Sequence, residues 1–270
     1  MITFTKMTGT GNDFIVFDNR NGRLTGREAE FFSSLCRRRF SVGADGVILA
    51  EKGERAPVRM RYYNSDGMEA AMCANGARCT AYFALHKGFT AENTFRMEAS
   101  DGFHEVEVTG PIVKFEMGAP RDYRSGFRFE YQPGLREGGF LNTGVPHLVL
   151  LVDGPSGLKD LNVGAVAPFY RNHRTFPGGT NVNFVQKISD NAIEVRTYER
   201  GVEAETLSCG TGCVASALVA YTVLSVRPPI RVVTRGGELR VEFDRDWKHI
   251  YLIGPVQMVY EGSLYPEEGR

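Results

Sequence analysis

The sequence has no excess of charge of either sign, because 32 lysines and arginines balance 32 aspartates and glutamates. Proteins that bind nucleic acids or anionic membrane surfaces usually carry a basic excess. We therefore expect neither kind of partner. The run Arg37-Arg38-Arg39 comes nearest to a basic patch, and we interpret it as the solvated end of a helix.

Long apolar runs are missing as well. No segment reaches the roughly 18 apolar residues that a membrane helix needs. Residues Met1 to Lys6 do not combine a charged segment with an apolar one, so we expect no signal peptide. The glycine-rich loops that bind nucleotides are absent too. The 5 cysteines are odd in number and do not form a disulfide framework, which favours a cytoplasmic location.

Three segments have the pattern of helices. Thr25 and Glu28 form a capping box, and apolar residues follow at helical spacing, which predicts a helix over 26–39. A second helix is expected over 75–87, ending at Gly88. The third, over 211–225, is apolar on almost every side, which is typical of a helix buried at the centre of a domain.

Most of the remaining chain has the pattern of strands. Two hairpins are predicted, each formed by a pair of alternating segments around a glycine-containing turn. The predicted strands are 103–108 with 112–117, 231–234 with 238–243, and, outside the hairpins, 148–152, 182–186 and 193–198. Many strands with few helices predict an α+β fold, in which a mostly antiparallel sheet closes around each buried helix.

The chain also has a weak internal repeat. A segment that starts Arg61-Tyr62-Tyr63-Asn64 precedes Cys73, and a segment that starts Arg196-Thr197-Tyr198-Glu199 precedes Cys209. Further upstream, residues 10–14 resemble residues 180–184. We therefore predict two pseudo-symmetric halves, 1–118 and 119–261, and regard the tail 262–270 as a candidate addition to the first half. Residues 121–140 are expected to be an irregular loop.

Cys73 and Cys209 lie in similar motifs, Cys73-Ala74-Asn75-Gly76 and Cys209-Gly210-Thr211-Gly212. Each motif opens a predicted helix, where exposed N–H groups and the helix dipole favour a thiolate. Inversion of a carbon requires one group that removes a proton from one face and another that returns a proton to the opposite face. Two related halves that meet at a cleft would supply these two groups, so we expect the active site there.

Other polar groups fit the same chemistry. Backbone N–H groups of residues 74–76 and 210–212 can bind a carboxylate at the helix starts. Arg200 can bind a carboxylate through two parallel hydrogen bonds. The side chains of three asparagines can both donate and accept hydrogen bonds to a substrate; they are Asn12, Asn64 and Asn181. His147 and Glu199 are titratable and can set the protonation states of the thiols.

The cysteines have other possible roles. Cys36, Cys79 and Cys213 are interpreted as structural, because a free cysteine usually packs as a small apolar residue. A zinc site made of Cys73, Cys79, Cys209 and Cys213 does not have the usual ligand spacing, so no metal is expected. A zinc-stabilised binding module and a dithiol redox protein that forms a Cys73–Cys209 disulfide remain alternatives.

The motifs together resemble those of diaminopimelate epimerases, in family order over nearly the whole chain. The resembling segments are 9–14, 43–46, 63–67, 73–79, 144–147, 181–185, 198–201 and 205–212. The resemblance implies two similar halves and an active site in the cleft that separates them. It also implies cofactor-independent interconversion of L,L- and meso-2,6-diaminopimelate, a step that feeds lysine and peptidoglycan synthesis, by an enzyme that is commonly a homodimer.

The resemblance also implies roles for single residues. Cys73 and Cys209 would be the two acid/base residues, and His147 and Glu199 would tune them. The implied substrate contacts are Asn12, Asn64, Ala74, Asn75, Asn181, Glu199, Arg200, Gly210 and Thr211. Ala74 stands where the family has glycine, Val145 where it has asparagine, and many members are one residue shorter between Arg200 and Glu205. A proline-type racemase of the same fold is the alternative enzyme. Arg200 and the three asparagines favour an acyclic diamino acid.

Overall fold

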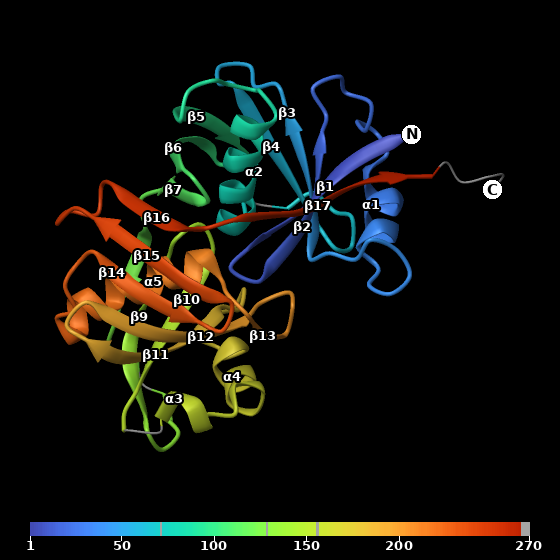
Figure 1. Ribbon diagram of the computed structural model, residues 1–270. Coiled ribbons are helices and arrows are strands. Elements are labelled where there is room, and N and C mark those ends of the chain that lie inside the picture. The colour runs from blue at the N-terminus through green and yellow to red at the C-terminus, as the bar shows by residue number, and fades with distance from the viewer. Residues whose placement is uncertain (71, 128, 155–156, 266–270) are drawn as a thin grey trace. The chain divides into compact units, whose positions relative to one another are not determined.

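A computed structural model describes residues 1–70, 72–127, 129–154 and 157–265 (Figure 1). The chain forms two compact units: unit 1 comprises Met1–Phe115 and Gly254–Arg270, and unit 2 comprises Glu116–Ile253. The first boundary lies a few residues before the 118/119 expected from the sequence. The chain returns to unit 1 at Gly254, earlier than the expected 262, because strand β17 (Gln257–Leu264) pairs with β1 (Ile2–Gly9).

Seven strands of each unit follow one another in the same pattern. In unit 1 they are β1, β2 (Asn12–Asp18), β3 (Gly46–Glu51), β4 (Val58–Asn64), β5 (Thr94–Ala99), β6 (Gly102–Thr109) and β7 (Ile112–Met117). In unit 2 they are β9 (Leu135–Asn142), β10 (Pro146–Val152), β11 (Asn181–Ser189), β12 (Ala192–Glu199), β14 (Ile230–Thr234), β15 (Gly237–Phe243) and β16 (Ile250–Pro255). Two short strands, β8 (Arg121–Arg124) and β13 (Ala204–Thr206), complete unit 2.

The pairing of these strands confirms two repeated halves. In unit 1, β1–β2 and β3–β4 are antiparallel, β2–β3 and β4–β5 are parallel, and β5, β6 and β7 form an antiparallel meander. In unit 2, β9–β10 and β11–β12 are antiparallel, β10–β11 and β12–β14 are parallel, and β14, β15 and β16 form the meander. The predicted α+β architecture of two similar halves is therefore correct.

The repeat differs in one respect from the sequence comparison. By topology β2 corresponds to β10 and β3 to β11, so Asn12, which begins β2, has its counterpart at the start of β10 and not in Asn181, which begins β11. The resemblance of residues 10–14 to 180–184 therefore aligns neighbouring strands. Both strands begin with an asparagine and continue with a buried phenylalanine, Phe14 in β2 and Phe184 in β11, which explains the misleading match.

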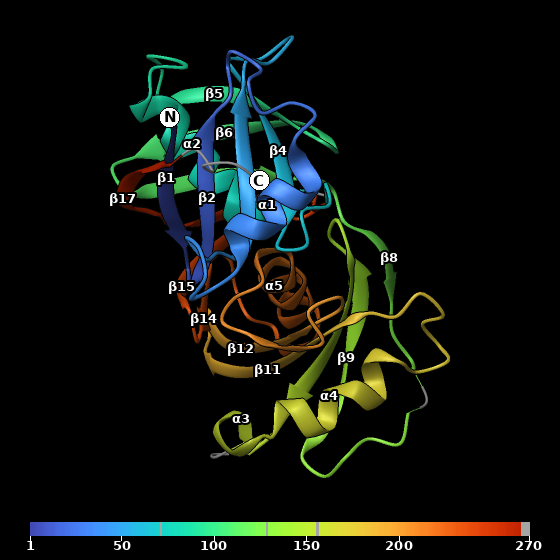
Figure 2. The same ribbon diagram turned by 90° about the vertical axis from the view of Figure 1, so that its right-hand side faces the viewer.

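A helix packs on the inner face of the sheet in each unit. Helix α2 (Ala74–His86) contacts β1, β2, β3, β4 and β6, and α5 (Gly210–Leu224) contacts β9–β12, β14 and β15. The strands of unit 2 surround α5 in Figure 2. Every α5 residue from Gly210 to Ala220 is buried, which confirms the prediction from its all-round apolar sequence. The predicted ranges 75–87 and 211–225 each differ from the structure by one residue at either end.

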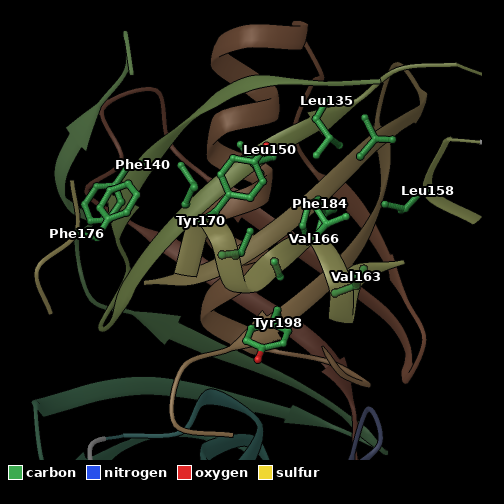
Figure 3. Packing of buried hydrophobic residues seen from close by; sticks show 14 residues of the cluster. Leu135, Phe140, Leu150, Leu158, Val163, Val166, Tyr170, Phe176, Phe184 and Tyr198 are labelled. Atoms are coloured by element: carbon green, nitrogen blue, oxygen red, sulfur yellow. The ribbon is translucent and has the colours of Figure 1, made fainter. Parts of the chain in front are cut away.

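Shorter helices cover the outer faces of both sheets. In unit 1, α1 (Glu28–Cys36) packs Phe32 and Leu35 on residues of β2 and β3. In unit 2, α3 (Gly157–Asp160) and α4 (Val163–Arg171) pack on β10, β11 and β12 (Figure 3). The sequence pattern did not indicate α3 or α4. The side chain of Asn162 caps α4 by accepting a hydrogen bond from the N–H of Ala165, at 3.2 Å.

Two predictions were wrong. The helix expected over 26–39 spans only Glu28–Cys36, and Arg27, not Thr25, is its N-cap. Gly26 has φ +85°, which lies outside the helical region, so the capping box does not form. The loop expected over 121–140 contains β8 and most of β9, and β8 pairs with the end of β9. Among the described residues, no helix is long and apolar enough to cross a bilayer.

The burial of α5 predicts a large difference in stability between two truncations in the same helix. Leu218 is fully buried, whereas Val223 is 40% exposed. We expect Leu218→Ala to lower the free energy of unfolding by about 2–5 kcal/mol, and Val223→Ala by less than about 1 kcal/mol. Denaturant unfolding measures both. Similar losses for the two variants would contradict a central position for α5.

Candidate active site

The two candidate catalytic cysteines occupy the same backbone position in the two units. Cys73 is the N-cap of α2 with φ −111° and ψ 114°, and Cys209 is the N-cap of α5 with φ −115° and ψ 111°. Their carbonyls accept the first helical hydrogen bonds, from Ala77 at 2.7 Å and from Cys213 at 2.8 Å. Both residues are partly exposed. The two helix starts therefore hold their cysteines in the same extended N-cap conformation.

The third residue after each cysteine is a glycine, but the two glycines are not equally constrained. A Cβ atom at Gly212 would lie 2.4 Å from Asn183 Oδ1 and 3.3 Å from His147 Cε1. A Cβ atom at Gly76 would lie 3.2 Å from Ile48 Cδ1, the flexible end of a side chain. The start of α5 thus approaches polar side chains of β10 and β11 so closely that only glycine fits.

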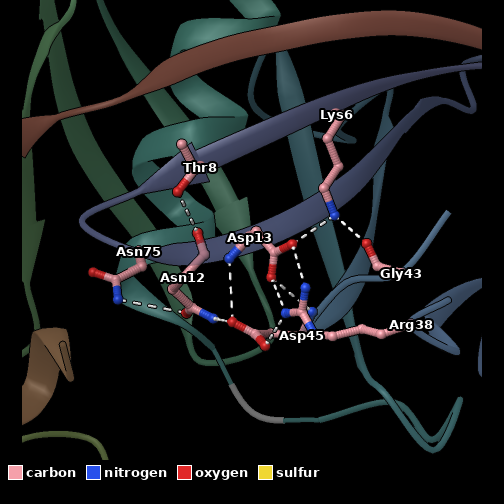
Figure 4. A network of polar contacts seen from close by, with 8 residues as sticks. All are labelled: Lys6, Thr8, Asn12, Asp13, Arg38, Gly43, Asp45 and Asn75. Atoms are coloured by element: carbon pink, nitrogen blue, oxygen red, sulfur yellow. Dashed lines mark hydrogen bonds and ion pairs between the residues drawn. The ribbon is translucent and has the colours of Figure 1, made fainter. Parts of the chain in front are cut away.

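Cys73 lies next to two asparagine side chains. Its Sγ donates to Asn12 Oδ1 at 3.6 Å, and Asn75 Nδ2 donates to the same oxygen at 3.5 Å. The other end of the Asn12 side chain donates from Nδ2 to Asp45 Oδ2 at 2.7 Å. Figure 4 shows this contact between Asn12 and Asp45. Because a carboxylate only accepts hydrogen bonds, Asp45 fixes the amide nitrogen of Asn12 on its own side and leaves the carbonyl oxygen facing the Cys73 thiol.

A network of charges holds Asp45 and its neighbour Asp13 in place (Figure 4). Arg38 contacts Asp13 at 2.5 Å and Asp45 at 2.8 Å, and Lys6 contacts Asp13 at 2.7 Å. Burial raises the pKa of Asp13, but the hydrogen bonds and charges of Arg38 and Lys6 outweigh it and lower the pKa overall. Arg38 is therefore part of the support for Asn12, and its side chain is also 58% exposed, in agreement with the solvated position expected from the sequence.

Sequence analysis assigned no role to Lys6, Asp13, Arg38 or Asp45. Asp13 and Asp45 belong to motifs that it did single out, 9–14 and 43–46. The parallel pairing of β2 with β3 brings the starts of these strands together, which a comparison of motifs alone does not reveal.

The other cysteines of unit 1 are buried. Burial raises the pKa of Cys79 to about 12 and the pKa of Cys36 to about 11. Cys79 and, in unit 2, Cys213 are fully buried within their helices. Thiols in such surroundings remain protonated at neutral pH and pack as apolar groups.

The surroundings of Cys209 favour the thiol. Burial and the charge of Glu199 raise the pKa of Cys209 well above its usual value. Hydrogen bonds from Thr211, whose Oγ1 lies 3.4 Å from the sulfur, and from the backbone of Gly212 lower it by less. The expectation that the helix start makes this cysteine a thiolate is thus not met, because burial has the larger effect.

His147 contacts Thr211, which in turn contacts Cys209. It lies in β10 and is fully buried, and its Nε2 is 2.9 Å from Thr211 Oγ1. Burial, and then the positive charge of Arg200, lower the pKa of His147 to about 3. The imidazole is therefore neutral at physiological pH. Its Nε2 contacts Thr211, and Thr211 contacts the thiol of Cys209.

Asn181, Glu199 and Arg200 lie together where β11 begins and β12 ends. The backbone N–H of Arg200 donates to Asn181 Oδ1 at 2.8 Å, and Asn181 Nδ2 donates to the carbonyl of Pro146 at 2.9 Å. The guanidinium of Arg200 donates to the carbonyl of Gly178 at 2.9 Å. The hydroxyl of Thr206 donates to Glu199. Asn181 therefore links three strands in addition to its expected contact with substrate.

The remaining predicted residues differ in their exposure. Asn64 ends β4 and is exposed, and its backbone N–H donates to the carbonyl of Met68 at 3.0 Å. Ala74 and Gly210 are the first residues of α2 and α5 and are buried. Within unit 1 the structure thus brings together Asn12, Asn75 and Cys73. Within unit 2 it joins His147 and Cys209 through Thr211.

Comparisons with known proteins agree on one family. A family model described as diaminopimelate epimerase matches residues 4–122 and 139–259. A relative named diaminopimelate epimerase from Archaeoglobus fulgidus is 41% identical over 100% of this chain and 98% of its own length. The relative of the same name from Chlorobaculum tepidum is 42% identical over 96% of this chain and 99% of its own length.

Solved structures extend the comparison of folds. A phenazine biosynthesis protein of the PhzF family from Bacillus anthracis has a TM-score of 0.72 at 16% identity, with coverage of 98% of this chain and 99% of that one. A probable proline racemase from Agrobacterium radiobacter K84 has a TM-score of 0.67 at 15% identity, with coverage of 98% and 93%. At such low identity these likenesses concern the fold alone.

The two motif glycines provide a matched pair of substitutions. At Gly212 a Cβ atom would overlap with the buried Asn183, so we expect Gly212→Ala to lower the free energy of unfolding by about 1–3 kcal/mol. Gly76→Ala meets only the end of Ile48, and the helix propensity of alanine offsets that contact. Its free energy of unfolding should change by less than about 1 kcal/mol. Denaturant unfolding of both variants is the measurement, and a larger loss for Gly76→Ala would refute the difference.

The neutral state of His147 predicts a dependence of stability on pH. The unfolded chain binds a proton at this residue below pH 6.5, whereas the folded protein binds it only at about pH 3. The stability contributed by the neutral ring is therefore fully present above pH 6.5 and is lost as the pH falls toward 3. When the pH falls from 7.5 to about 5.5, protonation of His147 in the unfolded chain should lower the free energy of unfolding by about 1.4 kcal/mol.

His147→Gln should remove that component, so its stability should fall less over this interval than that of the wild type. His249→Gln is the control, because the side chain of His249 is 63% exposed, and it should keep the wild-type slope. Denaturant unfolding at both pH values tests the comparison. Equal slopes for wild type and His147→Gln would show that the buried ring is not held neutral.

Proposed function

The chain belongs to the diaminopimelate epimerase family, and from this premise we propose that it interconverts L,L- and meso-2,6-diaminopimelate by a two-cysteine mechanism without a cofactor. The observation that carries the proposal is the equivalent placement of Cys73 and Cys209, each the N-cap of a buried helix with nearly the same φ and ψ. A pair of acid/base groups in equivalent positions suits a reaction that inverts one carbon.

In the proposed reaction the two thiols act on opposite faces of the same α-carbon. One thiolate removes the α-proton, and the carbon retains the electron pair as a carbanion. The opposite thiol then delivers its proton to the other face and becomes a thiolate. The reverse direction exchanges the two roles, so each cysteine is the base for one stereoisomer and the acid for the other.

The helix starts supply the binding and stabilisation that this reaction needs. Backbone N–H groups at the first turns of α2 and α5 can bind a substrate carboxylate, where developing negative charge also accumulates. Ala74 and Asn75 contribute them in unit 1, and Gly210 and Thr211 in unit 2. Asn12, Asn64, Asn181, Glu199 and Arg200 are proposed as further substrate contacts.

We assign Cys209 as the thiol of the resting enzyme, because burial and the charge of Glu199 both disfavour its thiolate. His147 and Glu199 are then the groups that tune it, His147 through Thr211 and Glu199 through its charge. A cytoplasmic location, a homodimer, and the absence of nucleic-acid and membrane partners belong to the same proposal.

Removing either thiol should abolish epimerisation. We expect Cys73→Ala and Cys209→Ala each to lower the rate with L,L-diaminopimelate by at least about a hundredfold, the usual minimum for loss of a positioned acid or base. The assay follows incorporation of deuterium at the α-carbon in deuterated water, without added pyridoxal phosphate or metal. Cys36→Ala is the matched control and should retain the wild-type rate. Near wild-type turnover by either Cys73→Ala or Cys209→Ala would reject the mechanism.

Assays with other substrates separate the rival functions. Turnover of proline in preference to diaminopimelate would favour a proline-type racemase. Turnover coupled to a thiol reductase, without epimerisation, would favour a dithiol redox protein.

A further inference from the structure

Asn183 is a buried residue that joins the site through hydrogen bonds alone. It lies in β11, opposite Val149 of β10 and Thr197 of β12, and its side chain is fully buried. Its Nδ2 is 3.1 Å from the carbonyl oxygen of Leu148 and 3.1 Å from His147 Nδ1. Its Oδ1 accepts a hydrogen bond from the hydroxyl of Thr197 at 3.0 Å.

The orientation of this amide follows from chemistry. The carbonyl of Leu148 can only accept, so the Asn183 atom that faces it must be the nitrogen. The same nitrogen also faces His147 Nδ1, and an amide nitrogen cannot accept a hydrogen bond. Therefore Nδ1 accepts and carries no proton.

The orientation of the amide determines the tautomer of His147. With Nδ1 unprotonated, the single ring proton is on Nε2, which donates to Thr211 Oγ1 at 2.9 Å. The hydroxyl proton of Thr211 is then available to Cys209 Sγ, 3.4 Å away. Each donor thus points toward the sulfur along the order Asn183, His147, Thr211, Cys209.

We propose that Asn183 is a positioning residue that fixes His147 as its Nε2–H tautomer, so that the Thr211 hydroxyl donates to Cys209 and stabilises its thiolate. The role in catalysis rests on the proposed function. The hydrogen-bond order itself does not, and it can be tested without an epimerase assay. Gly212 is part of the same arrangement, since only glycine leaves room for Asn183 Oδ1 beside the helix start.

Among the described residues, few charged or titratable groups act on the hydrogen-bonded series from Asn183 to Cys209. Glu199 on β12 and Cys213 on α5 act on the Cys209 thiol, and Arg200 acts on His147. None of them is changed in the variants below. In the threonine variants, a change in the titration of Cys209 therefore reports a change in its hydrogen bonds, because no charge is added near the sulfur. Asn183→Asp is the one variant that adds a charge.

The first test observes the tautomer directly. In protein labelled with ¹⁵N-histidine, the chemical shifts of the two ring nitrogens distinguish a protonated nitrogen from an unprotonated one. The chain has 5 histidines, and His147→Gln identifies the signals of His147. At neutral pH the wild type should have an unprotonated Nδ1 and a protonated Nε2. The opposite tautomer, or a doubly protonated ring, would overturn the proposal.

Asn183→Asp should reverse the order. A carboxylate accepts from Nδ1–H, which moves the ring proton from Nε2 to Nδ1, and Thr211 then donates to Nε2 in place of Cys209. Thr197→Val is the matched control, because Leu148 still orients Asn183 and the wild-type tautomer should persist. An unchanged tautomer in Asn183→Asp would count against Asn183 as the residue that fixes the ring.

The second test measures the thiolate. Alkylation of Cys209 by iodoacetamide is followed by peptide mass spectrometry as a function of pH, in the absence of substrate. In Asn183→Asp and in Thr211→Val the rate at neutral pH should fall about tenfold, which is one pKa unit. Thr211→Ser should restore the wild-type profile, and Thr197→Val should keep it within about twofold.

Thr211→Val also covers the case in which Asn183→Asp does not fold. Loss of the hydroxyl should lower Cys209 reactivity while the tautomer of His147 stays as in the wild type. If neither variant changes the pH profile of alkylation, the hydrogen bond to Cys209 does not stabilise the thiolate and the proposal fails. If the profiles shift as expected but the protein does not epimerise diaminopimelate, the proposed hydrogen-bond order is supported and the proposed function fails.

Discussion

Both halves depend on one constraint: a central helix whose residues are mostly buried has to be enclosed by its sheet. Enclosure buries the helix N-terminus along with its side chains, and the first N–H groups of a helix have no partner within the helix. Because these N–H groups are buried, they need hydrogen-bond acceptors other than bulk water. A start of this kind is suited to bind an anion, and in both α2 and α5 the residue that precedes it is a cysteine in extended conformation.

The same backbone is supported by different chemistry in the two units. Beside Cys73, the carbonyl of Asn12 is held by Asp45 and, behind it, by the charges of Arg38, Asp13 and Lys6. Beside Cys209, neutral groups perform the corresponding task, with Thr211 in contact with the sulfur and His147 behind it. One thiol therefore faces a carbonyl acceptor and the other a hydroxyl, so two cysteines in equivalent positions have different hydrogen-bond partners.

The sequence allowed prediction of what depends on local pattern. The two central helices, the hairpins and the cysteine motifs have strong periodicity or composition, and the structure contains these elements. The capping box at Thr25 failed because a glycine with positive φ follows it, and conformations of glycine are not visible in a pattern. Helix α4 was missed although Asn162 is its cap, because Pro168 interrupts its helical pattern. Asp45 and Asn183 become relevant only when parallel pairing places them next to Asn12 and His147.

The position of Cys209 illustrates how two effects of the same helix start compete. The dipole and N–H groups of a helix N-terminus stabilise a negative charge by about 0.3–2 kcal/mol. Burial can raise the pKa of an acid by about 3–5 units, and each unit corresponds to about 1.4 kcal/mol. Desolvation therefore outweighs the dipole, and the charge of Glu199 adds to it. The helix start and the Thr211 hydroxyl then do not make Cys209 a resting thiolate. They limit the cost of forming the thiolate, which is the state that Cys209 must reach in the proposed mechanism after it has given up its proton.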